Sequence, residues 1–354
     1  VKEDEDGISI NAKEAAKYGI IMSASHCEMM LRNNVGEWQA WFEKNKNNYT
    51  WQTDDWAKAF DYTLHKEQII QYWRERLIAN KEFESILALG IRGVHDGAYA
   101  NSKIDETFGN DVAMLKDVIT EQRKLIEEVY GDVDAVPQVL IPYKEIGNLY
   151  NAGLKDFLDE KVMLMWAEDN FGYVRQVPNE TERARTGGKG IYYHQSYWGH
   201  PKSYLWLNSF QFELMIEELN KAYHTGAKDY WILNVGDIKP GEIGMECFAK
   251  MAWQIDAFDE ASLKENFFMP QLTRDYHLSD TAANQAADVL LAYSQLNGTK
   301  RAEFFGTENP PAQYSALFKE KHSFPFSVTD AGDEGQITPL LVKILLDADA
   351  GTTG

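Results

Sequence analysis

The fold of this 354-residue chain is decided by Lys161-Val-Met-Leu-Met-Trp-Ala-Glu-Asp-Asn-Phe-Gly-Tyr173. Residues 162–166 are apolar without alternation, which is typical of a strand buried on both faces. Glu168, Asp169 and Asn170 follow where such a strand gives way to a loop. Barrel enzymes collect their chemistry at the C-terminal ends of the strands, so the pattern predicts a barrel strand that ends in acids. For this stretch alone, a strand end with a polar cap is an equally good interpretation, because acidic residues are common in turns.

Five other stretches, beginning near residues 18, 85, 138, 190 and 230, also have a buried-strand pattern. Helical patterns lie between them, and the clearest starts after the capping residue Asn110 and ends at Gly131. A long helical region is expected from residue 36 to 80, and a polar surface loop from 177 to 189. This alternation of strand, loop and helix predicts an α/β fold with a parallel sheet.

The number of strands limits the architecture. A closed (β/α)8 barrel needs eight parallel strands, and the sequence shows six. An open doubly wound sheet can be built from six, but it usually carries a glycine-rich phosphate turn, and no G-x-G-x-x-G or Walker motif is present. From about residue 240 the strand pattern gives way to an expected helical domain, with helical patterns at 240–258, 263–271, 280–296 and 311–321.

Composition argues against several classes of function. The net charge is −20, from 35 basic and 55 acidic residues, whereas nucleic acids and anionic membranes attract basic surfaces. Neither a membrane span nor a signal peptide is expected, because no run of about 18 apolar residues occurs and no apolar segment follows the acidic N-terminus. The two cysteines, Cys27 and Cys247, provide neither a disulfide framework nor the spacing of a zinc site.

Every predicted strand is followed by polar, chemically capable residues. In chain order these are His26 and Glu28; Arg92, His95 and Asp96; Lys144 and Glu145; Glu168, Asp169 and Asn170; His194 and Tyr197; and Asn234, Asp237 and Lys239. Six such ends on one side of a sheet are costly unless they face a polar cleft, so together they favour a functional site.

Single residues have plainer interpretations. Arg92 is also explained by a buried ion pair with Asp96 or Glu145. His194 is also explained as a hydrogen-bonded core histidine, and Asp237 as the cap of the turn before Pro240.

Several carboxylates with aromatic residues and no phosphate loop indicate glycoside hydrolysis, which needs one carboxylic acid and one carboxylate. The histidines and aspartates leave a metal-dependent hydrolase open, although no H-x-H or H-E-x-x-H spacing occurs.

Taken together, the strand ends resemble glycoside hydrolase family 115, the xylan α-1,2-glucuronidases. The matching segments run in family order across about residues 15–300, and they are Tyr18-Gly-Ile-Ile-Met-Ser-Ala-Ser-His-Cys-Glu-Met-Met30, Gly90-Ile-Arg-Gly-Val-His-Asp-Gly97, Ile141-Pro-Tyr-Lys-Glu145, Leu164-Met-Trp-Ala-Glu-Asp-Asn-Phe-Gly-Tyr173, Gly190-Ile-Tyr-Tyr-His-Gln-Ser-Tyr-Trp-Gly199 and Trp231-Ile-Leu-Asn-Val-Gly-Asp-Ile-Lys-Pro240. The sequence departs from the family pattern at Cys27, where a histidine or similar residue is common, and at Glu168, where an aspartate is common.

The resemblance implies a (β/α)8 TIM-like barrel followed by an α-helical bundle. Residues 1–240 would hold strands three to eight of the barrel, with the first two missing, and residues 241–354 would form the bundle region and an irregular tail. The implied activity is removal of α-1,2-linked glucuronic acid, or its 4-O-methyl ether, from xylan with inversion. The implied partners are glucuronoxylan and its oligosaccharides, without nucleic acid or membrane. A homodimer is left open, and export to the periplasm or the cell exterior is expected only for the full-length protein.

On this basis Glu168 and Asp96 are the expected acid and base, with Asp169 and Glu28 as rivals, and the sequence does not decide which of them protonates. Substrate contacts are expected from further strand-end residues, namely His26, Arg92, His95, Lys144, Glu145, Trp166, Asn170, His194, Tyr197, Asn234 and Asp237. Among these, the basic side chains are candidates to bind a uronate carboxylate, and an arginine can do so with two parallel hydrogen bonds. No metal ligand and no cofactor are assigned. Besides the metal-dependent hydrolase, an inactive carbohydrate-binding fragment is kept as an alternative.

Overall fold

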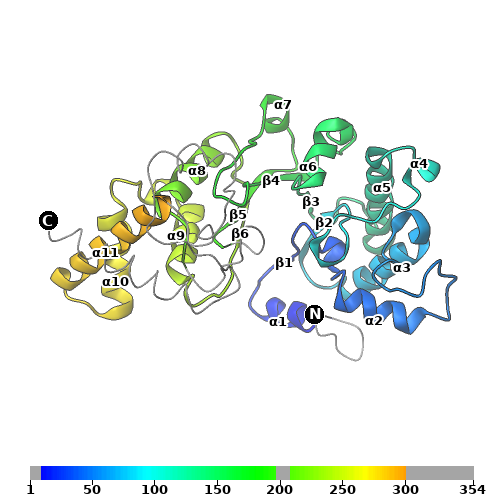
Figure 1. Ribbon diagram of the computed structural model, residues 1–354, viewed down its shortest axis with the longest axis horizontal. Helices are drawn as coiled ribbons and strands as arrows, with labels where there is room; N and C mark the ends of the chain where they lie inside the picture. Colours follow the sequence, from blue (N-terminus) through cyan, green and yellow to red (C-terminus); the bar gives the residue numbers. More distant parts are fainter. Residues whose placement is uncertain (1–8, 197–207, 300–354) are drawn as a thin grey trace, which may run out of the picture. The chain divides into compact units, whose positions relative to one another are not determined.

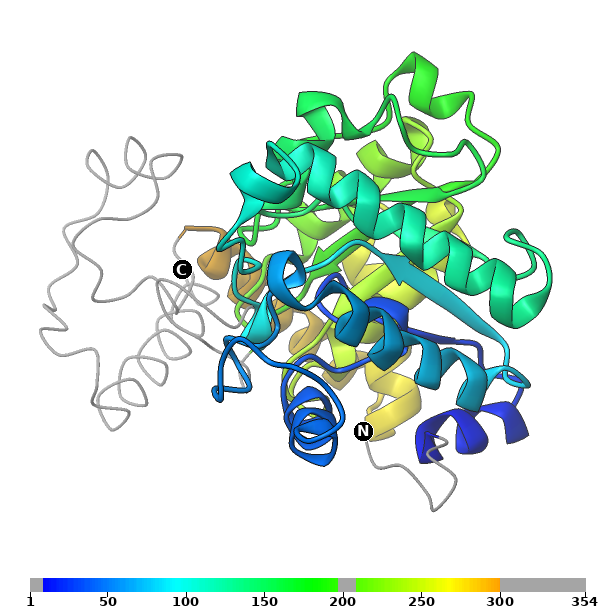
Figure 2. The same ribbon diagram turned by 90° about the vertical axis from the view of Figure 1, so that its right-hand side faces the viewer.

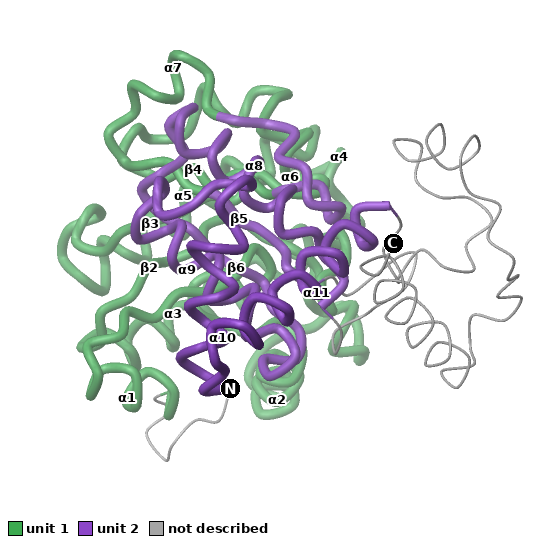
Figure 3. Tube along the Cα trace, turned by 90° about the vertical axis from the view of Figure 1, so that its left-hand side faces the viewer, with its two compact units in different colours: residues 1–167, 178–190 green, residues 168–177, 191–354 purple. Residues whose placement is uncertain are grey.

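The computed structural model describes residues 9–196 and 208–299 of the chain. The chain forms two compact units, which are coloured separately in Figure 3. Unit 1 comprises residues 1–167 and 178–190, and unit 2 comprises residues 168–177 and 191–354. Among the described residues, no helix is both long and apolar enough to cross a membrane.

Six strands follow one another in chain order in one sheet (Figure 1). They are β1 (Met22–Ser23), β2 (Ser85–Leu89), β3 (Gln138–Leu140), β4 (Met163–Ala167), β5 (Lys189–His194) and β6 (Tyr230–Asn234). The pairs β1–β2, β2–β3 and β3–β4 are parallel, with Ser23 opposite Ile86 and Leu140 opposite both Leu89 and Leu164. The α/β class, the six strands and these parallel pairs confirm the prediction. Parallel strands end at the same edge, so the residues after β1 to β4 meet there.

Unit 1 also contains the following helices and helical turns, which loops connect to the strands (Figure 2). They are α1 (Ile10–Lys17), η1 (Met29–Leu31), α2 (Gly36–Asn45), α3 (Tyr62–Asn80), η2 (Val94–Asp96), α4 (Ile104–Thr107), α5 (Asp111–Tyr130), α6 (Glu145–Leu149), the π-helical turn η3 (Tyr150–Leu154) and α7 (Glu180–Arg183). Two predictions are wrong in detail. The helical region expected over 36–80 is split into α2 and α3. The expected loop over 177–189 contains α7, because Asn179 and Glu182 form a reciprocal capping box.

Helix α5 shows how the sequence builds the end of β2. The Asn110 side chain accepts a hydrogen bond from the backbone N–H of Ala113 at 2.9 Å, and Gly131 ends the helix with a φ of +85°. One apolar face of α5 is buried, and it includes Leu115, Val118, Ile119, Leu125 and Ile126. On the same helix the buried Gln122 side chain bonds both backbone groups of Gly90, accepting from N–H and donating to C=O at 2.8 Å each. Gln122 therefore fixes the backbone two residues before Arg92.

Unit 2 holds the remaining helices, which are α8 (Phe212–His224), α9 (Glu242–Trp253), η4 (Ile255–Ala257), the π-helical turn η5 (Lys264–Phe268), α10 (Met269–Tyr276) and α11 (Asp280–Thr299). The helical patterns at 240–258, 263–271 and 280–296 are thus confirmed, and Ser279 caps α11 by accepting from the Ala282 N–H at 3.3 Å. Helix α11 continues beyond the expected end at residue 296 and includes Gly298, where a Cβ atom would come within 2.5 Å of the Gln211 side chain. The helix predicted at 311–321 and the tail lie outside the described residues, and the bundle remains a prediction.

Candidate active site

The predicted site residues divide between the two units. The ends of β1, β2 and β3 contribute His26, Glu28, Arg92, His95, Asp96, Lys144 and Glu145 to unit 1, and β4 contributes Trp166. Unit 2 holds Glu168, Asp169, Asn170, His194, Asn234 and Asp237. Tyr197 lies outside the described residues. Each group is described by itself below.

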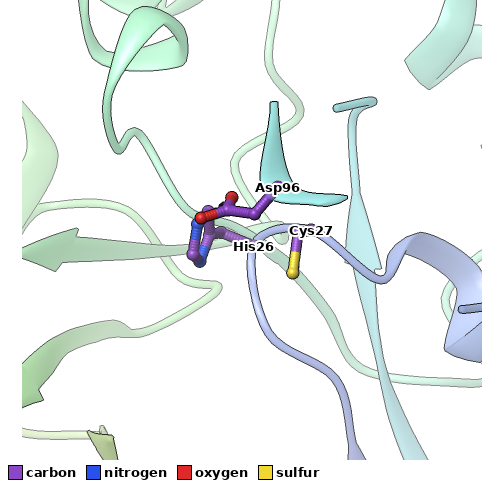
Figure 4. Close-up of side chains that lie close together, drawn as sticks. All are labelled: His26, Cys27 and Asp96. Atoms are coloured by element: carbon purple, nitrogen blue, oxygen red, sulfur yellow. Dashed lines mark hydrogen bonds and ion pairs between the residues drawn. The ribbon is translucent and has the colours of Figure 1, made fainter. Parts of the chain in front are cut away.

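Asp96 is the centre of a polar cluster in unit 1. Its Oδ1 contacts His26 Nε2 at 2.9 Å and accepts from Arg92 Nη1, while its Oδ2 accepts from Lys144 Nζ at 2.6 Å. Figure 4 shows the Asp96 carboxylate beside the His26 ring. Three strand ends that are far apart in sequence therefore meet at one carboxylate, as the parallel arrangement predicts.

The contacts around Asp96 decide its protonation state. Partial burial would raise the pKa of the Asp96 carboxyl, but hydrogen bonds from His26 and Lys144 and the charge of Arg92 outweigh burial and hold the pKa well below its usual value. Burial lowers the pKa of the His26 imidazole, although the bond to Asp96 opposes this. Since an ionised carboxylate only accepts, a neutral His26 donates from Nε2, and the contact is a hydrogen bond rather than an ion pair.

Arg92 pairs through its guanidinium group with two carboxylates, those of Glu145 and Asp96. It is 3% exposed, and its Nε and Nη2 donate to the two Glu145 carboxylate oxygens at 3.0 and 3.1 Å while Nη1 donates to Asp96. The simpler interpretation of Arg92 as a buried ion pair is confirmed, and it involves both of the predicted partners. Lys144, by contrast, keeps 29% of its side chain exposed. Lys144 is therefore the more accessible cation of the two.

His26, Cys27 and Asp96 are also a candidate metal site, because their ligand atoms lie within 4.8 Å of one another. Two observations oppose a divalent cation here. Arg92 and Lys144 already place two positive charges on the Asp96 carboxylate. Burial also raises the pKa of the Cys27 thiol, whereas thiolate is the form that binds metal. The positive charges and the protonated thiol around Asp96 therefore disfavour a metal ion and favour an anionic ligand near Lys144.

Several predicted residues of unit 1 lie outside this network. Glu28 accepts from the Asn33 side chain at 2.7 Å, and the exposed His95 ring lies 6.2 Å from the Trp56 ring. Trp166 is buried, and its Nε1 has no hydrogen-bond partner within the described part of the chain. Sequence reasoning missed Asn34, which donates to the carbonyl oxygens of Cys27 at 3.0 Å and Gly93 at 2.6 Å and so joins the loops after β1 and β2. No sequence pattern pointed to it.

Unusual backbone conformations concentrate after the strands. His95, Asp96, Lys144 and Asn170 have φ values of 54°, 58°, 53° and 67°, in the region that favours glycine. All four are predicted site residues that follow β2, β3 or β4. Such conformations cost about 1–3 kcal/mol each and are commonly retained at functional sites. The strain therefore supports the interpretation of these loops as a site rather than as plain connections.

Glu168 anchors the corresponding cluster in unit 2. Its side chain is 0% exposed, its Oε2 accepts from the Gly172 N–H at 2.8 Å, and its Oε1 contacts the ring Nδ1 of the buried His194. The interpretation of His194 as a hydrogen-bonded core histidine is thus confirmed. Asn234 Nδ2 donates to the Tyr192 hydroxyl at 2.8 Å.

Asp169 shapes the turn that follows β4. Its Oδ1 accepts from the N–H groups of Phe171 at 3.0 Å and Tyr173 at 3.1 Å, and its Oδ2 accepts from Arg175 Nε at 2.7 Å. The sequence analysis did not single out Arg175, which is partly exposed and has its guanidinium 4.9 Å from the centre of the Tyr173 ring. The Asp237 side chain is exposed, and it is the Asp237 backbone carbonyl that accepts from the Gly241 N–H.

Comparisons with known proteins agree with the resemblance noted in the sequence. The family profile described as Glycosyl hydrolase family 115 matches residues 2–304. Among solved structures, a family GH115 4-O-methyl-α-glucuronidase with specificity for decorated arabinogalactans is 35% identical, with a TM-score of 0.74. The alignment covers 96% of this chain but 41% of that protein. A search of curated proteins finds no match. The chain belongs to glycoside hydrolase family 115.

Proposed function

We propose that this chain is the major part of a catalytic domain that removes α-1,2-linked glucuronic acid, or its 4-O-methyl ether, from a polysaccharide. The observation that carries the proposal is the cluster of Asp96 with His26, Arg92 and Lys144 at the C-terminal ends of parallel strands, in a chain of family 115. An ionised carboxylate suits the activation of water in glycoside hydrolysis, and an accessible cation suits the binding of a uronate carboxylate.

The order of the strands supports a barrel. A doubly wound sheet reverses its strand order at a switch point, whereas the strands of a (β/α)8 barrel follow chain order, as β1 to β6 do. We propose that these are strands three to eight, that the helices after residue 240 belong to a following bundle, and that two further strands complete the barrel. A version of the chain that carries those two strands should then unfold at higher temperature.

Lys144 is the proposed contact for the uronate carboxylate. Arg92 was the favoured residue on sequence grounds, but each of its three guanidinium nitrogens already donates to Glu145 or Asp96. A hydrogen bond to a charged group contributes about 1.5–3 kcal/mol, so Lys144→Met should raise the KM for a uronoside about tenfold or more. Lys161→Met is the control, since Lys161 pairs with Asp134 and precedes β4, at the opposite end of the strand from the predicted site. An unchanged KM in Lys144→Met would remove Lys144 from this role.

The acid and base roles are also proposals. Asp96 does not suit the acid, because its partners hold the pKa of its carboxyl well below the usual value. We assign protonation of the leaving oxygen to Glu168, with Asp169 and Glu28 as rivals. Inversion requires the working carboxyl groups to lie about 6.5–9.5 Å apart, so that water fits between substrate and base. Loss of general acid catalysis should lower kcat by about 10²–10⁴-fold in Glu168→Gln.

The test of this assignment uses one substrate and one spectroscopic readout. Proton NMR during hydrolysis of a glucuronoxylo-oligosaccharide identifies the anomer that is released first, and inversion of an α-linkage gives the β-anomer. Asp169→Asn and Glu28→Gln are compared with Glu168→Gln in the same assay. Full activity in Glu168→Gln would show that Glu168 is not the acid and would leave Asp169 and Glu28 as the candidates.

The polysaccharide is proposed to be glucuronoxylan. The similar solved protein acts on decorated arabinogalactans, which makes an arabinogalactan the second candidate for this chain. Release of uronic acid from both polymers under one set of conditions separates the two. If a chelator abolishes release and a divalent metal restores it, the metal-dependent alternative replaces the carboxylate mechanism. Binding of uronic acid without turnover would support the inactive fragment.

A further inference from the structure

The C-terminal end of α9 carries an exposed aromatic side chain that the proposed reaction does not use. Trp253, the last residue of α9, is 91% exposed, although large aromatic side chains are mostly buried in folded proteins. It borders an open hollow of about 490 Å³, which is also lined by Glu246, Ala249, Lys250, Gln254, Ala257, Phe258 and Asn266. This volume lies within the range of about 300–1,000 Å³ that is usual for small-molecule sites.

Two amide side chains on the hollow are available to a ligand. Gln254 and Asn266 are both exposed, and neither side-chain amide makes a hydrogen bond within the described residues. Each amide offers a carbonyl acceptor and an NH₂ donor, which is the combination that sugar hydroxyl groups use. Besides these polar groups, the hollow is lined by the apolar residues Ala249, Ala257 and Phe258. A mainly apolar lining with a few polar groups is usual for sites that bind small molecules.

The charged side chains of the hollow neutralise one another. Glu246 pairs with Lys250 at 3.0 Å and with Arg274, and Arg274 pairs in turn with Asp275. The hydrogen bond from Arg274 holds the pKa of the Glu246 carboxyl below its usual value, so this acid stays ionised and paired. Among the described residues of the hollow, each charged side chain is paired with one of opposite sign, so the hollow suits a neutral ligand.

We propose that Trp253, Gln254 and Asn266 form a second carbohydrate site, which binds the neutral backbone of a polysaccharide. A pyranose ring has an apolar C–H face that stacks on an indole and an edge of hydroxyl groups that bond to amides. The site would hold the polymer while its uronic acid branches are cleaved elsewhere. The choice of oligosaccharide for the experiment rests on the proposed function, whereas the argument for the site itself does not.

The experiment is isothermal titration calorimetry of the whole chain with xylohexaose, and separately with a β-1,3-galactohexaose. Trp253→Ala should weaken binding by about two- to twelvefold, which corresponds to the loss of about 0.5–1.5 kcal/mol of aromatic stacking. Asn266→Ala should weaken it several-fold. Phe157→Ala is the matched control, because it removes an exposed aromatic residue from unit 1 and should leave binding unchanged.

Three results would overturn the second site: no binding of either oligosaccharide, equal binding by the unaltered chain and Trp253→Ala, or self-association that Trp253→Ala abolishes. Hydrolysis of a small aryl glucuronide separates this proposal from the proposed function, since Trp253→Ala should leave that rate unchanged. If the chain binds through Trp253, but neither the chain nor the version that carries two further barrel strands hydrolyses the aryl glucuronide, the second site is supported and the proposed function is not.

Discussion

Replacing Asp96 by asparagine tests whether the unit 1 cluster depends on an ionised carboxylate. The aspartate accepts from His26, Arg92 and Lys144, whereas an asparagine has a single acceptor oxygen and turns its NH₂ group toward at least one of these donors. Arg92 then keeps only Glu145 as a charged partner in a position where it is 3% exposed.

The magnitude follows from the exposure of each contact. Loss of a hydrogen bond between charged groups costs about 1.5–3 kcal/mol, and the buried Arg92 contact should fall within this range. The Lys144 contact should contribute about 0.5–1 kcal/mol, because Asp96 and Lys144 are 37% and 29% exposed and solvent screens them. We therefore expect Asp96→Asn to lower the free energy of unfolding by about 2–4 kcal/mol near pH 7, and Lys144→Met by about 0.5–1 kcal/mol.

The pH dependence gives an independent check. Because the folded protein depresses the pKa of Asp96, its contribution is complete above the unfolded-state pKa of about 3.9 and is lost as pH falls through the lower folded value. The difference in unfolding free energy between the unaltered chain and Asp96→Asn should therefore shrink as pH falls below about 4. Urea titrations followed by tryptophan fluorescence from pH 7 to pH 3 measure both quantities. Equal stability of the two proteins at pH 7, or a difference independent of pH, would refute the reasoning.

Three further changes test how the sequence builds the strand ends, each by urea denaturation. Gln122→Leu should cost about 2–4 kcal/mol, because it leaves the buried N–H and C=O of Gly90 unbonded; a cost below 1 kcal/mol would contradict this. Gly187→Ala should lower the free energy of unfolding by about 2–3 kcal/mol, since the new Cβ would lie 2.2 Å from the Lys161 carbonyl oxygen. Gly36→Ala is the control, because no atom lies within 4 Å of its new Cβ, and it should change this free energy by less than about 0.5 kcal/mol. Asn110→Ala should cost about 1 kcal/mol by removing the cap of α5, and an unchanged stability would show that the cap is replaced.

Much of the fold could be predicted because its signals are local. The run from Val162 to Trp166 predicts β4 through uniform apolarity, and Asn110 and Gly131 predict the ends of α5 through capping chemistry. The split between α2 and α3 was missed because aromatic residues, among them Tyr49, Trp51, Trp56 and Phe60, continue between the two helices. The helix expected over 280–296 stops short of Gly298, which α11 includes. The close approach of Gly298 to Gln211, 87 residues earlier, is a tertiary contact that no local pattern reports.

The candidate site could be predicted as a list of positions but not as a network. That residues after parallel strands gather at one edge follows from topology, and this brings His26, Asp96 and Lys144 together. The choice of partners does not follow, since Arg92 could have faced a substrate and instead pairs with Glu145 and Asp96. Asn34 could not be predicted because its side chain bonds to the backbone carbonyl oxygens of Cys27 and Gly93, and every residue has a backbone carbonyl oxygen.

The most direct measurement is release of uronic acid from glucuronoxylan and from a decorated arabinogalactan. It is made with this chain, with a version that carries the two further barrel strands, and with Glu168→Gln in that version. The account predicts that the extended version releases glucuronic acid or its 4-O-methyl ether as the β-anomer, and that Glu168→Gln loses the activity. Folded proteins that release no uronic acid from either polymer would contradict it.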